Sequence, residues 1–598
     1  MTFKASNKNT YWPDDYVSKR QSAQQAIQMI KRGQRVYIGS ACGEPQALMK
    51  ELASQSGNLT DLEIVRQLSL ETTPLAPVSD QSLAKNFNVR FFYLGSGKSN
   101  LLSRNKRFIT PVNLSSVPHL FKSRQLPIDV ALIQVCEPDD FGWMSLGVSV
   151  DVTLAAAQSA DLVIAQVNPR MPRILGKSFI SVNDVDVIVE QEEELLTIGN
   201  VSEYPFAHLI ANHVANLVDD GSTLQVSMGA TPDGLLQALA EKNDLGVHTQ
   251  VITDRFMSLV SLGVITNKKK GFNEGKMVAS SAIGSKNLYE FLHDNPGIDF
   301  FPSDYVNDPM IIARHYRMVA LNVARTMDLT GQVSADALPS NYLSGVTGIM
   351  DFIRGATMAP EGKNILMLPA TTNAGKNSSI VPELKSMPIV VPRGDVQYVV
   401  TEYGVVNLFG KSLQERAIAM ISIAHPNFRD ELFYKAKEMG LIDKERSLAD
   451  TIRSVYPQSI EDNIFIDGQR VHLRPARPTD ERALQEHFYR LDRKDVFNRF
   501  LHEKTSFVRD EVADVFQVDY DHNMTIVAVI GDPGFEKVLA VGCYFLDPES
   551  QIAEVAFSVE KAWQGKGIST VIQTKLADFA RDRGIKGLTA YTSNRNRG

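Results

Sequence analysis

Cysteine is scarce in this sequence, and long apolar runs are missing. Only Cys42, Cys136 and Cys543 occur in 598 residues, too few for a disulfide framework and typical of a reducing compartment. No stretch approaches the roughly 20 apolar residues that span a bilayer, and no apolar signal-peptide segment follows the first residues. The sequence therefore predicts a soluble, cytoplasmic protein without a membrane partner.

Basic charge is not in excess either. Lys and Arg number 62 against 69 Asp and Glu, a net charge of −7, and the short cluster Lys268–Lys270 does not alter that balance. A mildly acidic chain lacks the basic face of a nucleic-acid-binding protein. The eleven histidines are scattered without metal-ligand spacing. We therefore expect neither a nucleic-acid partner nor a bound metal.

What the sequence does have, up to about residue 455, is an alternation of short apolar runs and helical segments. The runs include Ile128–Val135, Leu162–Val167 and Ile365–Leu368. The helical segments include Ser22–Lys31 and Ser412–Ile423, and the second of these opens with a capping box. Near-continuous apolar strands separated by helices are typical of parallel sheets covered on both faces. The predicted fold class is α/β.

A weak internal repeat suggests two related α/β domains, residues 1–220 and 221–455. Val36–Leu48 resembles Leu224–Leu235, and each segment predicts a strand, a loop of small residues and a helix with proline in its first turn. A match this short also arises by chance, because many strand–turn–helix units look alike. The repeat is therefore only a hint.

The pattern changes after residue 455. The polar stretch 456–468 predicts a linker, and residues 469–598 predict an α+β domain. In that domain early helices are followed closely by the alternating runs Met524–Ile530, Val538–Phe545 and Ile552–Val559. Such closely spaced alternating runs favour an antiparallel sheet.

A first candidate site follows the run Leu224–Val226, where small residues lead into a helix. Its residues are Ser227, Met228, Gly229, Ala230 and Thr231. With Thr231 as N-cap and Pro232 at the first helical position, the N–H groups of the helix start would favour an anion. A phosphate or oxyanion cradle is one interpretation. A tight strand-to-helix turn is the other, and the segment alone favours it.

Two further segments place acidic residues next to glycine or a strand end. Gly345 and Gly348 precede Asp351 and Arg354, which predicts either a loop that approaches a ligand closely or a loop with an acid–arginine pair. Glu402 ends a predicted strand, where ligands gather in open α/β sheets. A structural glutamate that bonds its own loop is the favoured alternative for Glu402.

Six segments occur in the order found in one protein family. They are Val167–Pro172, Leu245–Pro309, Asp328–Asp336, Asp351–Ala356, Thr401–Gly404 and Ile423–Pro426. Over roughly residues 10 to 450 the chain thus resembles the acetyl-CoA hydrolase/transferase family, which includes 4-hydroxybutyrate and acetate CoA-transferases. The resemblance implies a two-domain α/β fold, acyl-CoA as substrate and a homo-oligomer. It also implies that the Ser227–Thr231 loop and the loop of Gly345 and Gly348 approach CoA.

The chemistry implied by the resemblance is covalent. A glutamate carboxylate attacks the acyl-CoA carbonyl to give an anhydride, the CoA thiolate converts this to a glutamyl-CoA thioester, and a second carboxylate takes the CoA. The matching position here is Gln250, in Gly246-Val-His-Thr-Gln250. An amide is neutral and its nitrogen lone pair is delocalised. We therefore expect this half to bind acyl-CoA with its transfer chemistry lost or altered.

Two other acids, Asp254 and Glu402, are candidates to substitute for the missing carboxylate. Asp254 lies four residues farther along what is expected to be an extended strand, and about 13 Å is too far to replace Gln250. Glu402 is the better spare acid, although members of the family keep it beside their nucleophile.

The segment Ala553–Thr570 predicts a strand, a glycine-rich turn and a helix. It resembles the GNAT acetyltransferase signature Gln-X-X-Gly-X-Gly/Ala, with Ser569 in the last position. The resemblance implies that the strand pairs with pantetheine amides and that the helix start receives the pyrophosphate. Glu554 is a candidate general base for an amine, and an ordinary exposed strand carboxylate is an equal alternative. The implied acetyl-CoA-binding residues are Phe557, Val559, Gln564, Gly565, Lys566, Gly567, Ile568 and Ser569.

The same resemblance implies a further helix and two more strands after the fifth strand. Because the sequence ends at Gly598, we expect this domain to be incomplete as given.

Three functions remain open at this point. The favoured one is a CoA-dependent acyltransferase, in which an acyl-CoA-binding body precedes a GNAT domain that moves acetyl from acetyl-CoA to an amine. A protein lysine is one candidate for that amine. The second is an active acetyl-CoA hydrolase or carboxylate CoA-transferase, of the acetate or 4-hydroxybutyrate type, that uses another acid. The third is a non-enzymatic acyl-CoA sensor.

Overall fold

The computed structural model describes most of the chain. The described residues are 11–68, 87–93, 107–198, 206–227, 230–335, 337–338, 341–342, 345–444, 456–508, 515, 519–520 and 522–592. The chain divides into two compact units. The first comprises Met1–Arg325, Gln332–Met367 and Leu384–Gln397, and the second comprises Thr326–Gly331, Leu368–Glu383 and Tyr398–Gly598.

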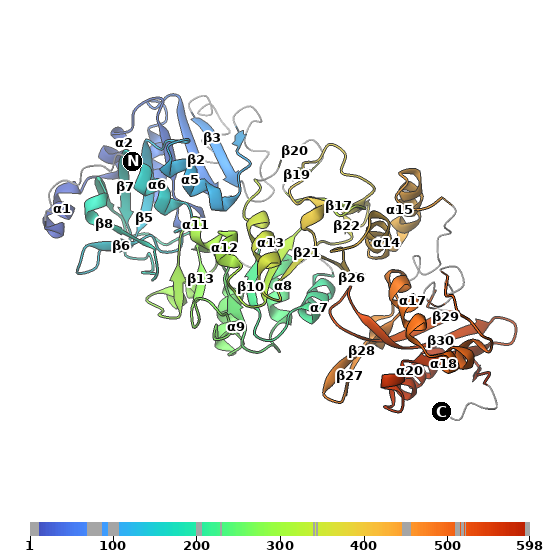
Figure 1. Ribbon diagram of the computed structural model, residues 1–598. Coiled ribbons are helices and arrows are strands. Elements are labelled where there is room, and N and C mark those ends of the chain that lie inside the picture. The colour runs from blue at the N-terminus through green and yellow to red at the C-terminus, as the bar shows by residue number, and fades with distance from the viewer. Residues whose placement is uncertain are drawn as a thin grey trace. The chain divides into compact units, whose positions relative to one another are not determined.

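The first sheet of unit 1 has seven parallel strands in the order β4-β3-β2-β1-β5-β7-β9 (Figure 1). Its strands are β1 (Arg35–Ile38), β2 (Leu62–Leu68), β3 (Phe87–Tyr93), β4 (Arg107–Ile109), β5 (Val130–Val135), β7 (Leu162–Val167) and β9 (Val187–Glu190). Every residue of β5 is buried, as are six of the seven residues of β2. The predicted parallel α/β fold is confirmed, and its strands lack apolar–polar alternation because both faces of the sheet are covered.

Helices on both faces provide that cover. They are α1 (Trp12–Lys19), α2 (Ala23–Gln28), α3 (Gln46–Ser54), α5 (Val117–Lys122) and α6 (Thr153–Ser159). Val36 and Ile38 of β1 share a core with α2 and α3. Tyr37 points to the opposite face, because successive strand residues alternate. Its hydroxyl lies 2.8 Å from the Thr153 hydroxyl of α6, and its ring contacts Phe121 of α5.

A second group of parallel strands in unit 1 runs in the order β11-β10-β16-β21. The strands are β10 (Thr223–Val226), β11 (Gly246–Val247), β16 (Met318–Val323) and β21 (Lys363–Met367), and the helices around them are α7 (Ala207–Leu217), α8 (Ala230–Ala238), α9 (Asp254–Ser261) and α13 (Ile349–Met358). Phe352 and Ala356 of α13 pack on Met318 and Ala320 of β16. This packing fixes where α13 begins, which matters for the site.

Shorter elements complete unit 1. The strands are β6 (Trp143–Ser145), β8 (Phe179–Ser181), β12 (Val251–Ile252), β13 (Met277–Ala279), β14 (Ser281–Ala282), β15 (Ile298–Phe300), β18 (Val333–Ser334), β19 (Ala337–Leu338) and β20 (Asn341–Tyr342), and the helices are α10 (Lys286–Leu292), α11 (Ser303–Val306) and α12 (Pro309–Ile312). β12 pairs with β14 and β13 pairs with β15, in both cases in parallel.

Unit 2 begins with short strands, an antiparallel hairpin and two helices. These elements are β17 (Thr326–Asp328), β22 (Thr371–Thr372), β23 (Asn377–Ser378), β24 (Ile380–Val381), β25 (Tyr398–Thr401), β26 (Gly404–Asn407), α14 (Leu413–Ser422) and α15 (Pro426–Glu438). The hairpin pairs Tyr398 with Asn407 and Thr401 with Gly404. The predicted capping box at the start of α14 is confirmed, because the Ser412 side chain accepts from the Glu415 N–H and the Glu415 side chain accepts from the Ser412 N–H.

The rest of unit 2 is a six-stranded sheet in the order β27-β28-β29-β30-β31-β32, with helices on both faces. Its elements are β27 (Asp462–Ile466), β28 (Gln469–Pro475), α17 (Glu481–Arg490), α18 (Arg493–Phe500), β29 (Asn523–Ile530), β30 (Lys537–Asp547), β31 (Ile552–Val559), α20 (Ile568–Asp582) and β32 (Gly587–Thr589). All pairs are antiparallel except β31–β32, which is parallel. The predicted antiparallel α+β arrangement is present.

The predicted linker 456–468 is wrong. β27 lies inside it and pairs with β28, and Ile460 and Ile466 enter the core under α20. The stretch appears polar in the sequence because β27 is an edge strand whose Asp462, Asn463 and Phe465 face solvent. A solvent-exposed edge strand resembles a loop in composition.

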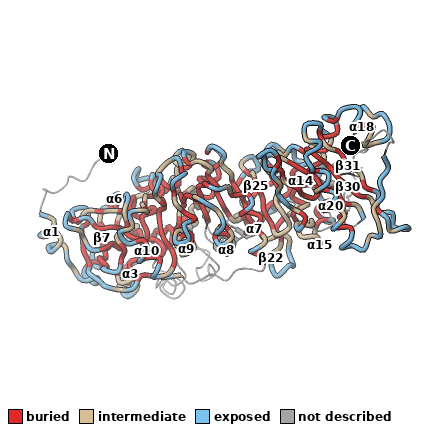
Figure 2. The backbone as a smooth tube through the Cα atoms, turned by 90° about the horizontal axis from the view of Figure 1, so that it is seen from below, coloured by how far each residue is buried: buried red, intermediate tan, exposed pale blue. Residues whose placement is uncertain are grey.

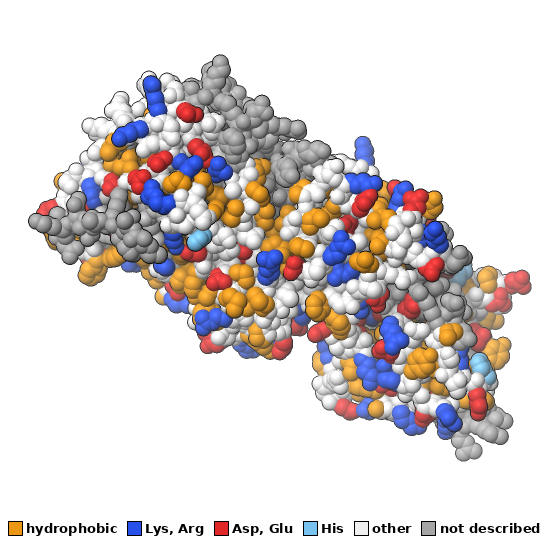
Figure 3. Space-filling model, turned by 45° about the horizontal axis from the view of Figure 1, so that its top comes forward, with side chains coloured by type: hydrophobic (Ala, Val, Ile, Leu, Met, Phe, Trp, Pro, Cys, Tyr) orange, Lys and Arg blue, Asp and Glu red, His pale blue; other side chains and the backbone are white. Residues whose placement is uncertain are grey.

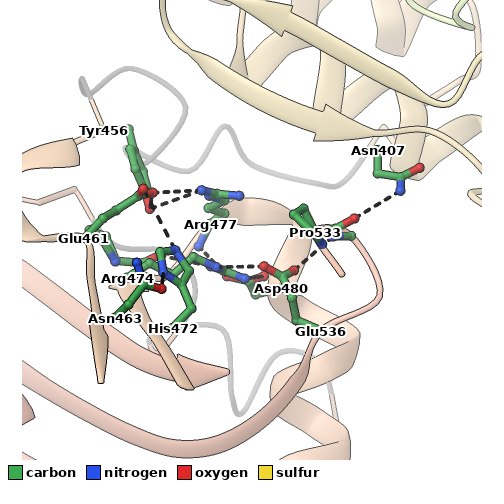
Figure 4. A network of polar contacts seen from close by, with 12 residues as sticks. Asn407, Tyr456, Glu461, Asn463, His472, Arg474, Arg477, Asp480, Pro533 and Glu536 are labelled. Atoms are coloured by element: carbon green, nitrogen blue, oxygen red, sulfur yellow. Dashed lines mark hydrogen bonds and ion pairs between the residues drawn. The ribbon is translucent and has the colours of Figure 1, made fainter. Parts of the chain in front are cut away.

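Figure 4 shows a polar network that ties this sheet to the β26–α14 segment of the same unit. The Asn407 side-chain N–H donates to the Pro533 carbonyl over 3.0 Å, in the turn between β29 and β30. In the same turn Glu536 accepts from Arg474, which Asp480 also binds through two oxygens. The turn between β29 and β30 is therefore bonded by Asn407 on one side and by Arg474 on the other.

Burial and surface charge follow the arrangement of sheets covered by helices. In Figure 2 the strands inside each layer are mostly buried, and exposure is concentrated on outer helix faces and turns. On the face shown in Figure 3, basic and acidic side chains are interspersed over the described residues. No helix among those described is both long and apolar enough to cross a membrane.

Candidate active sites

The Gln250 position lies between two short strands of unit 1. Gln250 follows β11 and precedes β12, and its backbone carbonyl accepts hydrogen bonds from Ser280 N at 3.2 Å and Ser281 N at 3.1 Å. The side chain is half-buried. Its Oε1 lies 3.0 Å from the position that a Cβ on Gly348 would take. Two residues that the sequence analysis proposed separately thus meet in space.

Gly348 is the N-cap of α13, and no larger residue fits without movement. A Cβ there would lie 2.1 Å from Nδ2 of Asn307 as well as beside Gln250. The preceding residue, Thr347, has a φ of +59°, and its carbonyl accepts from Leu114 N over 3.0 Å. The loop therefore packs closely against Asn307 and Gln250, and its close approach to a ligand stays a prediction. Gly345 itself is buried.

A buried carboxyl group stands behind this loop. Asp351, in the first turn of α13, accepts from Ser115 N at 3.1 Å, from Ser115 Oγ at 2.7 Å and from Asn307 Nδ2 at 3.4 Å. Burial raises the pKa of Asp351 to about 6. The predicted loop with an Asp351–Arg354 pair is wrong, because both residues lie in a helix and the carboxylate bonds Ser115 and Asn307.

Asn307 and Ser115 were missed by the sequence analysis. Asn307 lies within a segment that carried the family resemblance, so its presence was visible but its role was not. It is fully buried, and among the described residues its Oδ1 has no hydrogen-bond partner. A buried amide oxygen without a partner is costly, so this oxygen is available to a ligand donor.

The strand that leads to Gln250 is fixed by buried basic groups. Lys270 is fully buried, and its Nζ donates to the carbonyls of Val247 and Lys276, each over 2.7 Å. Burial lowers the pKa of Lys270 to about 7, and it lowers the pKa of His315 to about 3. His248, whose ring centroid is 4.3 Å from that of His315, contacts the Val306 carbonyl at 2.8 Å. These groups position the backbone before Gln250.

The Ser227 loop follows β10. Ser227 N donates to the Leu321 carbonyl over 2.9 Å, and its buried Oγ has no hydrogen-bond partner among the described residues. Met228 and Gly229 lie outside the described residues. α8 begins at Ala230, so Thr231 lies in the first turn of the helix rather than at its N-cap. That difference is small, and helix ends commonly shift by one or two residues.

The other acids that could replace the missing carboxylate are each engaged. Asp254 begins α9 and accepts from Ser285 N and Ser285 Oγ. The chain between Gln250 and Asp254 is extended as expected, since it comprises β12 and the extended residue Thr253. In unit 2, Glu402 accepts from Ala370 N over 2.8 Å. In this bond Glu402 has a structural role, which the sequence analysis gave as the alternative to ligand binding.

The acetyl-CoA signature of unit 2 lies where two parallel strands separate. β31 pairs with β32 only from Ile552 to Glu554. Beyond that point the edge of β31 is unpaired among the described residues, and Phe557 and Val559 lie on this stretch with side chains toward α20. Unpaired N–H and C=O groups of a strand edge can bind an extended amide chain.

The glycine-rich turn after β31 leads into α20. Gly565 and Gly567 have φ values of +74° and +83°, and a Cβ on either would have no atom within 4 Å. Ile568 is the buried first residue of α20, and Ser569 is exposed beside it. The first N–H groups of a helix have no intrahelical acceptor, and the open space at Gly565 and Gly567 before them suits a diphosphate.

Side chains around this turn brace it. Gln564 Nε2 donates to the Val559 carbonyl over 3.1 Å and to Asp495 Oδ2 of α18 over 2.8 Å. Lys566 Nζ pairs with Asp467 at 2.8 Å. Glu554 is exposed and lies opposite Phe545 of β30. Within the described residues, no group of three His, Cys, Asp or Glu side chains is arranged to hold a metal ion.

Comparison with known proteins identifies the families to which the chain is similar. Residues 3–200 match a model of the acetyl-CoA hydrolase/transferase N-terminal domain, residues 284–436 match the C-terminal domain, and residues 488–598 match the acetyltransferase (GNAT) family. Members of these families use CoA thioesters as substrates.

The chain is also similar to individual proteins. It is 41% identical over 428 residues to 4-hydroxybutyrate coenzyme A transferase of Clostridium kluyveri, covering 71% of this chain and 99% of that one. Among solved structures, RipA from Yersinia pestis is 33% identical with a TM-score of 0.68, and 4-hydroxybutyrate CoA-transferase from Porphyromonas gingivalis is 34% identical with a TM-score of 0.62. Both matches cover 72% of this chain and 100% of the other. The chain is a transferase that belongs to the acetyl-CoA hydrolase/transferase family and carries a GNAT acetyltransferase domain at its C-terminal end.

Proposed function

We propose that this chain is a CoA-dependent acyltransferase whose two parts act differently. The CoA-transferase body binds acyl-CoA without forming a covalent glutamyl-CoA intermediate. The GNAT domain transfers acetyl from acetyl-CoA to an amine, with protein lysine as one candidate acceptor. Assembly as a homo-oligomer and a cytoplasmic location stay predictions.

The observation that carries the first part is the amide of Gln250 beside Gly348. The covalent route needs a carboxylate anion, because the nucleophile must hold the acyl group as an anhydride and then the CoA as a thioester. An amide supplies neither the charge nor a comparable nucleophilic oxygen. The Gln250 amide can still hydrogen-bond, with Nε2 donating to the thioester carbonyl, so the proposal retains binding of the thioester.

The engagement of nearby acids supports the same conclusion. Asp351 is bonded by Ser115 and Asn307, and Asp254 is bonded by Ser285. To serve as a nucleophile, either carboxylate would have to give up these hydrogen bonds and leave buried donors unsatisfied. The alternative of an active hydrolase or carboxylate CoA-transferase therefore needs a rearrangement that the proposal avoids.

Trapping of the covalent intermediate tests the body. Purified wild-type protein and the variants Gln250→Glu and Gln250→Ala receive acetyl-CoA and butyrate, followed by borohydride or hydroxylamine and intact-mass analysis. We expect no trapped CoA thioester in the wild type or in Gln250→Ala, and trapping with CoA exchange in Gln250→Glu. Trapping and exchange in the wild type would contradict the proposal and favour the carboxylate CoA-transferase.

Labelled acetyl transfer tests the GNAT domain. Gly567→Glu places a carboxylate where a diphosphate would bind and strains a left-handed backbone, so we expect transfer to an amine to be lost. Gly584→Glu is the matched control, because Gly584 also has a positive φ of +75° and open space but follows the other end of α20. If acetyl-CoA binds to the wild type but no acceptor is labelled, the acyl-CoA sensor is the better description.

A further inference from the structure

A half-buried guanidinium lies on the α17/α18 face of the GNAT sheet. Arg499, on α18, donates from Nη2 to Cys543 Sγ over 3.4 Å and packs 5.1 Å from the Phe500 ring. Its Nε is buried, and none of the residues that the structure describes bonds it. Within the described residues none of its contacts is a carboxylate. A cation removed from water in this way is stabilised by an anion that binds it.

The position of Arg499 is set by the turn that follows β31. Asp495 Oδ2 accepts from Gln564 Nε2 over 2.8 Å, and Asp492 pairs with Lys561 at 3.5 Å. Asp495 and Arg499 are four residues apart and so share one face of α18. Asp495 contacts Gln564 of the acetyl-CoA signature. Arg499 lies one helical turn after Asp495 and therefore contacts the sheet at Cys543.

Strand register places Arg499 beside Glu554. Cys543, which Arg499 contacts, lies opposite Ala556 of β31, and its Sγ lies 3.6 Å from the Ala556 carbonyl. Glu554 is two residues before Ala556 and shares its face of the strand. Two residues of an extended strand span about 7 Å. A cation and an exposed carboxylate therefore lie about 7 Å apart along the strand.

Two neighbouring polar groups on this face, Cys543 and His487, are neutral near pH 7. Burial raises the pKa of the Cys543 thiol. Burial also lowers the pKa of His487 to about 4, and its ring contacts Ser558 Oγ at 2.9 Å. Neither group neutralises Arg499 near pH 7, so its charge is available to a ligand.

We propose that the acetyl acceptor is a small amino acid, with its carboxylate on Arg499 and its amino group at Glu554. The proposal rests on the acetyl transfer proposed above and names its substrate class. The bound ammonium first gives one proton to the Glu554 carboxylate. The neutral amine nitrogen then attacks the acetyl carbon, so a C–N bond forms and the C–S bond breaks. The second proton of the nitrogen passes to the leaving CoA thiolate, which departs as the thiol.

The short spacing distinguishes this acceptor from a protein lysine. In an α-, β- or γ-amino acid the ammonium and carboxylate are a few bonds apart and fit a separation of about 7 Å or less. The ε-ammonium of a lysine side chain is followed by four methylene groups, which offer no charge to Arg499.

Acceptor kinetics on the full chain test the assignment. Labelled acetyl transfer is measured with glycine, β-alanine and γ-aminobutyrate, with glycinamide as an amine lacking the carboxylate, and with a lysine peptide. We expect kcat/KM for the best amino acid to exceed that for glycinamide at least about tenfold. Arg499→Met should raise the KM for the amino acid at least about tenfold with little change in kcat.

Controls separate recognition from folding. Arg499→Lys keeps the charge and should recover part of the loss, while Arg493→Met, on the exposed first residue of the same helix, should leave the KM unchanged. An unchanged KM for acetyl-CoA shows that the domain is intact. Transfer that ignores the carboxylate, or that favours the lysine peptide, overturns this assignment and leaves acetyl transfer standing. No transfer to any acceptor overturns the proposed acetyl transfer itself.

Discussion

The buried pair between Arg474 and Asp480 gives the sharpest stability prediction. Arg474 is 1% exposed, and its two Nη atoms donate to the two Asp480 oxygens over 2.7 and 2.8 Å. Glu536 accepts a third bond over 3.2 Å. The change proposed is Asp480→Ala, which leaves a buried guanidinium with Glu536 as its remaining carboxylate partner and a bond to the Pro475 carbonyl (Figure 4).

The expected cost follows from that geometry. Breaking a buried pair by removing one partner costs about 3–5 kcal/mol, since the remaining charge is desolvated without compensation. Because Glu536 stays in place, we expect the lower end, about 3 kcal/mol. The double variant Arg474→Met/Asp480→Leu removes both charges, and we expect it to cost less than Asp480→Ala alone.

Fluorescence can isolate this part of the chain. The sequence has three tryptophans, and in a Trp12→Phe/Trp143→Phe background the signal reports Trp563, next to the acetyl-CoA turn. Urea unfolding then gives the free energy of unfolding of this region. The matched control is Asp578→Ala, which breaks an exposed helix pair with Arg581 and should change the free energy by at most about 0.5 kcal/mol.

Acidification adds a second readout for the same pair. Burial alone would raise the pKa of Asp480, but the Arg474 guanidinium outweighs it and holds the pKa below the ordinary value. The stability that Asp480 adds is therefore present above about pH 4 and is lost as the pH falls through the folded-state pKa. An Asp480→Ala cost below about 1 kcal/mol, or a double variant less stable than the single one, would refute this reasoning.

Three other predictions concern the CoA-transferase loop and the attachment of the GNAT domain. Gly348→Ala puts a Cβ 2.1 Å from Asn307 Nδ2, so we expect acetyl-CoA binding to weaken at least about tenfold by calorimetry, and unchanged binding would contradict a close-approach loop. The pKa of Asp351 is raised to about 6, so the folded state keeps a proton that the unfolded chain loses; urea midpoints should fall as the pH rises from about 4 to 6, and Asp351→Asn should flatten that slope. Asn407→Ala removes the bond to the Pro533 carbonyl, and we expect the free energy of unfolding reported by Trp563 to fall by about 1 kcal/mol with unchanged acetyl transfer, whereas an unchanged free energy would show that this bond does not stabilise the turn.

Local chemistry made some elements predictable. The α14 start is fixed by Ser412 and Glu415, which lie three residues apart and satisfy each other's backbone N–H groups. Strand β5 is an unbroken apolar run because both of its faces are covered. In each case the deciding interaction joins near neighbours or follows from burial of every side chain.

Other predictions failed because residues far apart in the sequence decide the structure at those positions. β27 appears polar in sequence, and it is a strand only because β28 supplies its hydrogen bonds. The sequence predicted a pair between Asp351 and Arg354. Instead the Asp351 carboxylate accepts a hydrogen bond from Ser115, which lies far away along the chain. Arg499 left no signal in the sequence, since a single arginine on an amphipathic helix is usually exposed.

The sequence by itself determined the chemical groups, which are an amide at Gln250 and a glycine-rich turn before α20. Only the tertiary structure decided that Gly348 lies close to both Gln250 and Asn307, and that β31 and β32 separate after Glu554. The reason is physical. Side-chain identity is a local property, whereas strand register and helix packing arise from burying surfaces that lie far apart along the chain.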